Sequence, residues 1–414
     1  MKYIYPLLSG LVAISLFSCQ KSRPDTDPWE IEKIKVEAVP LSLTKAQEAF
    51  IQQNNTFATR LLTLIQAQEG AKSFFFSPFS IAIDLTMLLA GSDGDGFKEL
   101  AAVLGYGDNL ALVNDYSKQM IEKAPTWDAS VQFSLANAFL GNAKYPLKTG
   151  YQDLLKNNYQ AAFALMDFSQ KQDVLDYING WCKEKTNGLI PSILDNVNPD
   201  AVLFLLNAIY FKAKWNAPFD KSETKTSSFI KDTGNTVSLP MMHQVGLKNY
   251  AIGKEWKALR LPFGNGAFEL QLLLPNEGTT VFELTGTVQK VGWNYFFSQT
   301  YGVQVDVKIP RFETTYSEAD FAQYIKELGV SGIFKGDCFS AISDEKIYVS
   351  QIIHRARIRI DEEGTEATGA TVIGMDGATG PDQKPVAFHC NHPFLYAIVE
   401  NKTGAIFFLG KFEG

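Results

Sequence analysis

The segment "IRIDEEGTEATGATVIGMDGATGPDQ", from Ile358 to Gln383, combines the pattern of a strand with the composition of a loop. A strand-like run ends in acidic and turn-forming residues and is followed by about twenty residues rich in Thr, Ala and Gly. The alternation nevertheless continues. If every second residue from Thr365 onward is placed in one set and the residues between them in another, both charged residues, Glu366 and Asp376, fall in the second set. A strand with one buried face requires this division, whereas a plain surface loop does not. The other set is free of charge: Thr365, Ala367, Gly369, Thr371, Ile373 and Met375.

The composition predicts a folded body with a large core. The chain has 414 residues, of which 46% are hydrophobic and 13% aromatic, so disorder is excluded for most of it. A net charge of -7 disfavours a nucleic-acid partner or a polybasic membrane surface. Beyond the N-terminal region the cysteines are odd in number and far apart, which favours buried single thiols over disulfides: Cys182, Cys338 and Cys390.

The N-terminal residues predict export. Lys2 precedes the uncharged apolar stretch from Tyr5 to Phe17, which is shorter than the roughly 20 residues that a membrane-spanning helix needs. Leu16, Ser18 and Cys19 resemble the lipobox of a bacterial lipoprotein signal peptide, although the residue between Leu16 and Ser18 is bulkier than usual. We expect residues 1–18 to be the signal peptide and Cys19 to be lipidated, with simple cleavage without lipidation as the alternative.

Residues 19–41 are polar and contain Pro24, Pro28 and Pro40, which predicts a tether between the lipid and the folded body. Gln20 follows Cys19 in place of the Asp that retains lipoproteins in the inner membrane. We therefore expect an outer-membrane lipoprotein that faces the periplasm or the cell surface. Loss of residues 1–18 removes one of 38 basic and none of 45 acidic residues, so the net charge changes from -7 to -8.

Helical and strand patterns divide the body into two halves. Helical spacing of apolar residues is found from Thr44 to Gln68, and further helical segments follow as far as Gly188. From Ala201 onward strand patterns dominate, and several are apolar at nearly every position, which suggests a sheet covered on both faces. The order predicts one large α+β domain.

Enzyme motifs are missing from the sequence. It has no Gly-x-Ser-x-Gly elbow, no Gly-x4-Gly-Lys phosphate loop and no His-Glu-x-x-His, and it contains four histidines. The run "HCNH", from His389 to His392, is better explained by a structural histidine near a strand start than by a metal site. We expect no enzyme activity, no metal and no cofactor.

Six segments, in this order, resemble the serpin family: "FFFSPFSIAIDLTMLLAGSDGDGFKEL", "LFLLNAIYFKAKWNAPFD", "LRLPFGNGAFELQLLLPNE", "VDVKIPRFETTYS", "IDEEGTEATGAT" and "HPFLYAIVENKTGAIFFLGKF". The resemblance covers residues 42–414. It implies a single α+β domain in which a helix-rich first half packs on a large central β-sheet, with further sheets and an exposed reactive loop at about 362–385.

The resemblance also implies a function. In serpins a protease cleaves the exposed loop, and the loop then inserts as a new strand into the main sheet. The chain is thus expected to be an irreversible, suicide-substrate inhibitor of serine proteases, a monomer whose partner is the target protease. The alternative is a non-inhibitory serpin-fold protein that serves as a binding or surface module. A Pro or a charged inward residue in the hinge would favour that alternative, and neither is present.

When this chain is matched to the serpin family residue by residue, the resemblance implies roles for two groups of residues. The hinge is Glu362, Glu363, Gly364, Thr365, Glu366 and Ala367. The network that controls opening of the sheet comprises Ser77, Ser80, Asn207 and His354, together with Trp215 over the entry point and Arg311 as the charge partner of Glu362. Thr368 and Thr371 depart from the smaller residues that inhibitors often carry, and "GSDGDG" replaces a more usual turn.

Counting along the loop as in inhibitory serpins places the scissile bond between Ala378 and Thr379. No Arg, Lys or large aromatic residue lies nearby, which disfavours trypsin-like and chymotrypsin-like targets. A small Ala suits an elastase-like pocket. Met375 is the alternative, and it too suits an elastase or a papain-like cysteine protease.

Overall fold

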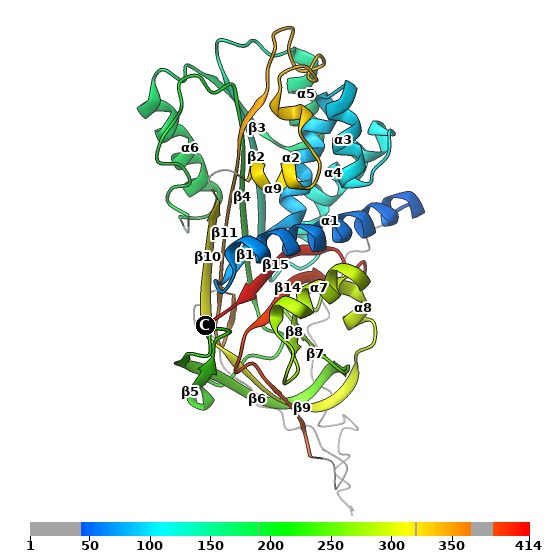
Figure 1. Ribbon diagram of the computed structural model, residues 1–414, viewed down its shortest axis with the longest axis vertical. Coiled ribbons are helices and arrows are strands. Elements are labelled where there is room, and N and C mark those ends of the chain that lie inside the picture. Colours follow the sequence, from blue (N-terminus) through cyan, green and yellow to red (C-terminus); the bar gives the residue numbers. More distant parts are fainter. Residues whose placement is uncertain (1–42, 189, 319–320, 366–383) are drawn as a thin grey trace, which may run out of the picture. The chain divides into compact units, whose positions relative to one another are not determined.

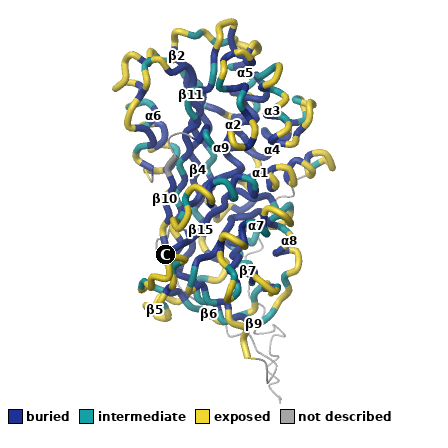
Figure 2. Tube along the Cα trace, in the orientation of Figure 1, coloured by how far each residue is buried: buried dark blue, intermediate teal, exposed yellow. Residues whose placement is uncertain are grey.

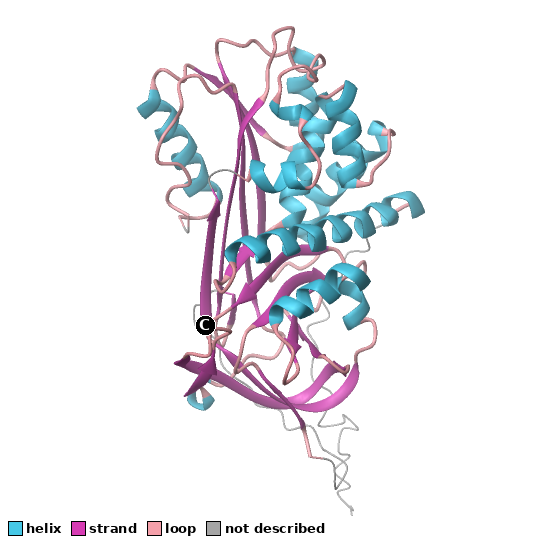
Figure 3. Cartoon of the chain, viewed as in Figure 1, coloured by secondary structure: helices cyan, strands magenta, loops and turns pink. Residues whose placement is uncertain are grey.

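Most helices lie in the first half of the chain and most strands in the second, as expected, and Figure 3 shows how the two kinds of element are arranged in space. The computed structural model describes four stretches that belong to one compact unit: residues 43–188, 190–318, 321–365 and 384–414 (Figure 1). The predicted signal peptide and tether lie outside the described residues, as does the loop from 366 to 383. No helix within the described stretches is both long enough and apolar enough to cross a bilayer.

The α-helices of the described residues are α1 (Lys45–Glu69), α2 (Pro78–Gly91), α3 (Gly94–Leu104), α4 (Leu110–Lys123), α5 (Thr149–Tyr159), α6 (Lys171–Lys185), α7 (Val281–Val291), α8 (Trp293–Phe297) and α9 (Ala322–Glu327). Their ends follow local chemistry. Thr44 caps α1 with a capping box, and Gly105 ends α3 in the left-handed conformation. The "GSDGDG" run is the turn between α2 and α3, so it is a helix-to-helix connection.

The strands are β1 (Phe74–Phe76), β2 (Gln132–Asn142), β3 (Ala162–Met166), β4 (Leu203–Lys214), β5 (Lys225–Ile230), β6 (Thr236–Ile252), β7 (Trp256–Pro262), β8 (Phe268–Pro275), β9 (Tyr301–Pro310), β10 (Phe312–Glu318), β11 (Val349–Ile360), β12 (Gly364–Thr365), β13 (Val386–His389), β14 (Phe394–Glu400) and β15 (Ile406–Phe412).

The main sheet has the strand order β10-β11-β4-β2-β3. Its two middle strands, β11 and β4, are parallel and pair from Val349–Leu203 to Arg355–Ala208. Beyond that point β11 stays paired with β10 and β4 stays paired with β2, but β11 and β4 have no further register with each other. The short strand β12 pairs antiparallel with the end of β4.

Successive side chains of β4 point to opposite faces of the main sheet and pack in two separate parts of the core. Leu205, Ile209 and Phe211 pack in the larger core, which includes α2, while Phe204 and Leu206 pack with α6. Figure 1 shows α2 and α6 on opposite sides of the sheet, and Figure 2 shows that its strands are largely buried. The main sheet is therefore covered on both faces, as its apolar strands predict.

The second sheet has the order β1-β15-β14-β8-β7-β6-β9-β13, and β5 also pairs with β6. Strands β8, β14 and β15 are buried at every position. The three cysteines of the described residues are free and buried, as expected.

The structure corrects one expectation. Strands β1, β2 and β3 lie in the half of the chain where the sequence pattern indicated helices alone. Strand β2 is rich in Ala, Ser and Asn, which have weak strand propensity, and its pairing with β4 over ten residue pairs determines its conformation. The "HCNH" run lies between the end of β13 at His389 and the beginning of β14 at Phe394, so it does lie near a strand start.

One buried group opposes folding. Asp84 in α2 is 1% exposed, and neither carboxylate oxygen has a hydrogen-bond partner among the described residues. Burial raises the pKa of Asp84 well above its ordinary value. The folded chain therefore retains a proton that the unfolded chain releases above about pH 4, and stability falls as the pH rises through that value.

We expect Asp84→Asn, which keeps the shape of the side chain without its ionisation, to melt at least about 2 °C above the wild type at pH 7. The gain should shrink toward zero below about pH 3, where both states of the wild type are protonated. Thermal melts by circular dichroism at a series of pH values test this, with the exposed Asp153→Asn as control. A gain that does not depend on pH would contradict the assignment.

Candidate functional site: the hinge and the strands it enters

The hinge residues Gly364 and Thr365 occupy the end of the main sheet. Thr365 lies opposite Ala213 and Gly364 opposite Lys214 in the β12–β4 pair. Ala213 N–H donates to Thr365 Oγ1 over 2.6 Å, and Thr365 is 1% exposed. Because directly opposed residues share a face of a sheet, Thr365 lies on the same face as Ala213, which packs in the larger core.

Only glycine fits at position 364. Its φ is +141°, and an added Cβ would overlap the carbonyl oxygen of Ala213 and lie 2.7 Å from Lys214 Cα. The hinge can therefore approach β4 because this residue has no side chain.

The two glutamates of the hinge that the structure describes, Glu362 and Glu363, are buried and paired. Glu362 Oε1 accepts a hydrogen bond of 2.7 Å from Thr224 Oγ1, and Arg311 Nη1 lies 3.5 Å from the same oxygen. Glu363 is paired with Lys221. Glu362 thus lies beside Arg311, and the turn before β5 supplies one further partner to each glutamate: Thr224 to Glu362 and Lys221 to Glu363.

Trp215 fixes the backbone just before the hinge strand. Its Nε1–H donates to the carbonyl of Asp361 over 2.8 Å, and its backbone N–H donates to the carbonyl of Glu363 over 2.9 Å. The ring stacks on Phe263 with 4.6 Å between centroids. Trp215 is therefore a buried residue that supports the backbone of the hinge.

A second group lies further along the sheet, beneath the paired part of β11 and β4. Ser77 caps α2, accepts from Ser80 N–H over 3.1 Å, and donates from Oγ to the carbonyl of Phe407 over 2.7 Å. Its backbone N–H donates to His354 Nε2 over 3.1 Å. His354 on β11 lies opposite Asn207 on β4. The four network residues from the sequence thus meet where the two strands pair.

The ionisation of His354 agrees with this contact. Burial lowers the pKa of His354 to about 3, so the imidazole is neutral and its Nε2 can accept the Ser77 N–H. Asn207 Nδ2 donates to Asn137 Oδ1 over 2.8 Å, a partner on β2 that the sequence did not reveal. Three polar atoms of this group have no partner among the described residues: His354 Nδ1, Asn207 Oδ1 and Asn137 Nδ2.

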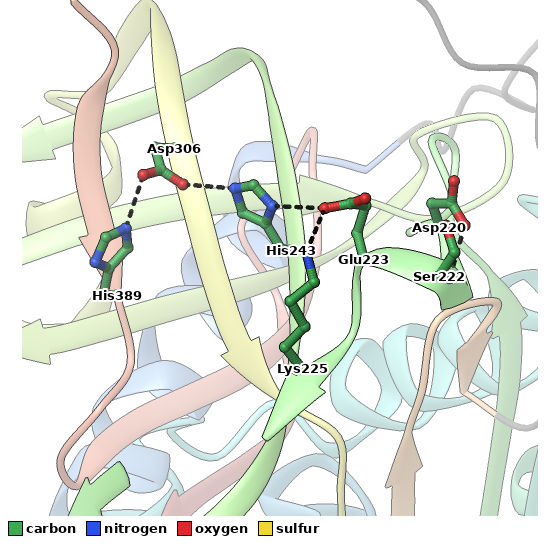
Figure 4. Close-up of polar contacts among 7 residues, drawn as sticks. All are labelled: Asp220, Ser222, Glu223, Lys225, His243, Asp306 and His389. Atoms are coloured by element: carbon green, nitrogen blue, oxygen red, sulfur yellow. Dashed lines mark hydrogen bonds and ion pairs between the residues drawn. The ribbon is translucent and has the colours of Figure 1, made fainter. Parts of the chain in front are cut away.

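The far end of the loop is held by a separate chain of polar contacts (Figure 4). His389 at the end of β13 contacts Asp306 Oδ2 on β9 over 3.0 Å, and His243 on β6 contacts Asp306 Oδ1 over 2.9 Å. His243 Nδ1 lies 3.8 Å from Glu223 Oε2, which also contacts Lys225. Burial alone would raise the pKa of Asp306, but contacts with His389 and His243 outweigh it and lower the pKa. Together with Lys225 at the start of β5, these residues connect four strands, and His389 links β13 to β9.

The comparisons with known proteins follow this geometry. The family model described as serpin (serine protease inhibitor) matches residues 52–413. The chain belongs to the serpin family. Iripin-2 of Ixodes ricinus is 30% identical over 395 residues, which covers 92% of this chain and 98% of that protein. Human neuroserpin is 29% identical over 364 residues, covering 84% and 87%.

Solved structures agree on the fold. The crystal structure of tengpin, a thermophilic serpin in the native state, matches with a TM-score of 0.82 at 24% identity and covers 92% of this chain and 98% of that one. The predicted α+β serpin fold is therefore confirmed. Serpins are typically protease inhibitors and act on target proteases, although some are non-inhibitory.

Several predicted residues lie outside the described part of the chain. These are Glu366, Ala367, the bond between Ala378 and Thr379, the alternative Met375, and Cys19. Other residues of the site were missed by the sequence analysis: Thr224, Lys221, Asn137, His243 and Asp306. Each is a common polar residue whose role comes from a partner more than 60 positions away, so no local motif marks it.

We expect Gly364→Ala to lower the free energy of unfolding by about 3 kcal/mol, because it adds an overlap with β4 to an unfavourable φ. Gly234→Ala is a matched control: its φ is +80°, but an added Cβ meets nothing within 4 Å. That control should lose only about 1 kcal/mol. Urea denaturation measures both, and equal losses would show that the hinge does not pack against β4 as described.

Proposed function

We propose that this serpin is an irreversible inhibitor of serine proteases, in which cleavage of the loop lets the segment after Thr365 enter the main sheet between β4 and β11. One observation carries the proposal: Thr365 already pairs with Ala213, while β4 and β11 are unpaired with each other from there to Ala208 and Arg355. The first pair of the new strand thus stands at the open end of the sheet.

Extending this register gives each inward residue of the loop a partner. Ala367 would lie opposite Phe211, and Thr371 would lie opposite Asn207. Ile373 and Met375 would lie opposite Leu205 and Leu203, so apolar residues meet apolar ones. The polar Thr371 would arrive beside Asn207 and His354, whose Oδ1 and Nδ1 atoms have no partner among the described residues. A threonine at this position, unusual for the family, thus suits this sheet.

The free energy available is large. Fourteen residues from Thr365 to Ala378 would form a strand of about 46 Å at roughly 3.3 Å each. About ten new ladder hydrogen bonds, each contributing on the order of 1 kcal/mol, favour insertion by around 10 kcal/mol. This is comparable with the whole stability of a domain. The six residue pairs between β11 and β4, which must separate first, offset part of it.

The chemistry of trapping follows from this movement. The target protease attacks the carbonyl of Ala378, the bond to Thr379 breaks, and an acyl-enzyme forms. Insertion then carries the attached protease along the sheet. A shift of its oxyanion hole by a small distance suffices to stall deacylation.

The target class rests on the residue before the cleaved bond. A small Ala378 supports an elastase-like serine protease, and Met375, if the register differs, supports an elastase or a papain-like cysteine protease. The N-terminal sequence supports export and an outer-membrane anchor at Cys19. We propose a monomer that meets its protease at that membrane, with no nucleic acid involved.

A non-inhibitory binding or surface protein is the second function considered. A charged or rigid residue on the inward face of the hinge would favour it. The described hinge instead presents Gly364 and the neutral Thr365 to β4. The inhibitory function is therefore better supported.

Incubation with an elastase-like protease should yield a band on denaturing gels at the summed mass of the protease and the cleaved inhibitor. The band survives denaturation because the ester from Ala378 is covalent. Trypsin-like enzymes serve as the comparison and should give little complex. Clean cleavage by every protease tested, without any complex, would favour the non-inhibitory function.

Thr365→Arg is the matched variant for this gel. It would place a charge on the buried face of the entering strand, where an unpaired ion costs several kcal/mol. The variant should be cut and released as a substrate, whereas Thr365→Ser, which keeps the hydroxyl bonded to Ala213, should still form complex. If Thr365→Arg forms as much covalent complex relative to cleaved inhibitor as the wild type does, residue 365 does not point into the core of the sheet.

Nicking the loop between Gly374 and Gly380 with a non-specific protease should raise the melting temperature. A gain of about 10 kcal/mol corresponds to about 20 °C for a chain of this size. A nick in an ordinary loop leaves stability unchanged or lower. One preparation is split, half is nicked, and both halves are melted under identical conditions. A nicked half that melts at or below the intact half rules out insertion.

A further inference from the structure

A cavity of about 290 Å³ lies where strands β6 and β7 separate. The two strands pair from Ile252–Lys257 to Asn249–Arg260, and then β6 continues along β9 while β7 runs toward Trp215. The turn after β4 lies across the opening. The walls are formed by Trp215–Ala217, Gln244, Leu247–Asn249, Arg260–Pro262 and Gly302.

The two basic side chains that line the cavity, Arg260 and Lys248, differ in whether they have a counter-ion. Arg260 is neutralised, because its Nε–H donates to the buried carboxylate of Glu269 over 2.7 Å. Lys248 lines the same cavity and is half-buried, but its ammonium group has no hydrogen bond or ion pair with any described residue. Burial lowers the pKa of Lys248. A cation removed from water without a counter-ion is unfavourable, and a bound anion would relieve this.

The remaining walls are apolar or carry amides. Trp215, Leu247, Leu261 and Pro262 supply apolar surface. Asn216, Asn249 and Gln244 supply side-chain amides. The volume is at the lower end of the range of about 300–1,000 Å³ for small-molecule sites. The walls therefore match a short apolar body that ends in one anionic group.

We propose that this cavity binds a small organic carboxylate with an apolar body, whose carboxylate pairs with Lys248. The ligand would also contact Trp215, which donates hydrogen bonds to the carbonyls of Asp361 and Glu363 just before the hinge strand. A bound ligand therefore stabilises the support of the hinge and slows entry of the loop. This second effect rests on the proposed function, whereas binding does not.

Isothermal titration calorimetry of the intact protein tests binding, with octanoate as the probe and octanamide as its uncharged match. Octanoate should saturate a single site, and octanamide should bind about tenfold more weakly, since a charge-assisted contact is lost. Lys248→Met, which keeps the apolar stem, should weaken octanoate binding about tenfold as well.

Two further variants control for general damage. Gly302→Leu adds a side chain beside Leu247, where a Cβ would lie 3.6 Å from the nearest atom, and it should block octanoate by filling the cavity. Lys254→Met removes an exposed lysine on the same hairpin outside the cavity and should leave binding unchanged. Non-saturable binding, or equal affinity in wild type and both cavity variants, would overturn the site.

The effect on the hinge is measured separately. The rate at which the nicked chain gains thermal stability should fall at least about twofold at saturating octanoate, and should not change in Lys248→Met. Saturable binding with an unchanged rate would overturn the coupling and leave the site standing. A nicked chain that never gains stability, with or without octanoate, would overturn the proposed function instead.

Discussion

The antiparallel pairing of Thr365 with Ala213 is the interaction on which the other features of the site depend. It fixes which face of an entering strand points into the core, and a slip of one residue would turn Glu366 inward. Because β4 and β11 are parallel to each other, one strand that runs antiparallel to β4 is antiparallel to both neighbours. Glu362, Glu363 and Trp215 all act just before this pair, so their hydrogen bonds set its position.

Several buried or unpaired polar groups in and beside the main sheet oppose folding of the intact chain. The group at His354 and Asn207 leaves polar atoms without partners among the described residues, and such atoms cost about 1–3 kcal/mol each when buried. Asp84 on α2 is a buried carboxyl without a partner in that part of the chain. The edges of β4 and β11 that face each other are unpaired beyond Ala208 and Arg355. These groups lower the stability of the intact chain, and the proposed entry of a strand would relieve those that lie on its path.

Sequence patterns predicted the elements whose signal is local. Ser77 and Pro78 mark the start of α2, and the long apolar runs of β4 and β11 indicate buried strands. The sequence could not predict β2 from its Ala- and Asn-rich composition, nor β6, where Pro240 and Gly246 interrupt the alternation and many positions are exposed. The cavity at Lys248 could not be predicted from the sequence either. It exists because β6 and β7 separate, which depends on strands β9 and β4 far away in the sequence.

Chain length explains why cleavage is needed. In the extended register, Met375 would lie opposite Leu203, ten residues along β4 from Ala213, or about 33 Å. The uncut chain must then return to Val386, which is held by β13 through its pairing with β9 and the contact of His389 with Asp306. The ten intervening residues, with eleven steps from Met375 to Val386, reach at most about 40 Å when fully extended, and part of that length would be used in rounding the end of the sheet. The uncut loop therefore has almost no slack to fill the sheet while β13 stays paired. In the proposed mechanism, a cut after Ala378 would remove this constraint and leave β13 in place, so the free energy of insertion would be released while the protease is attached.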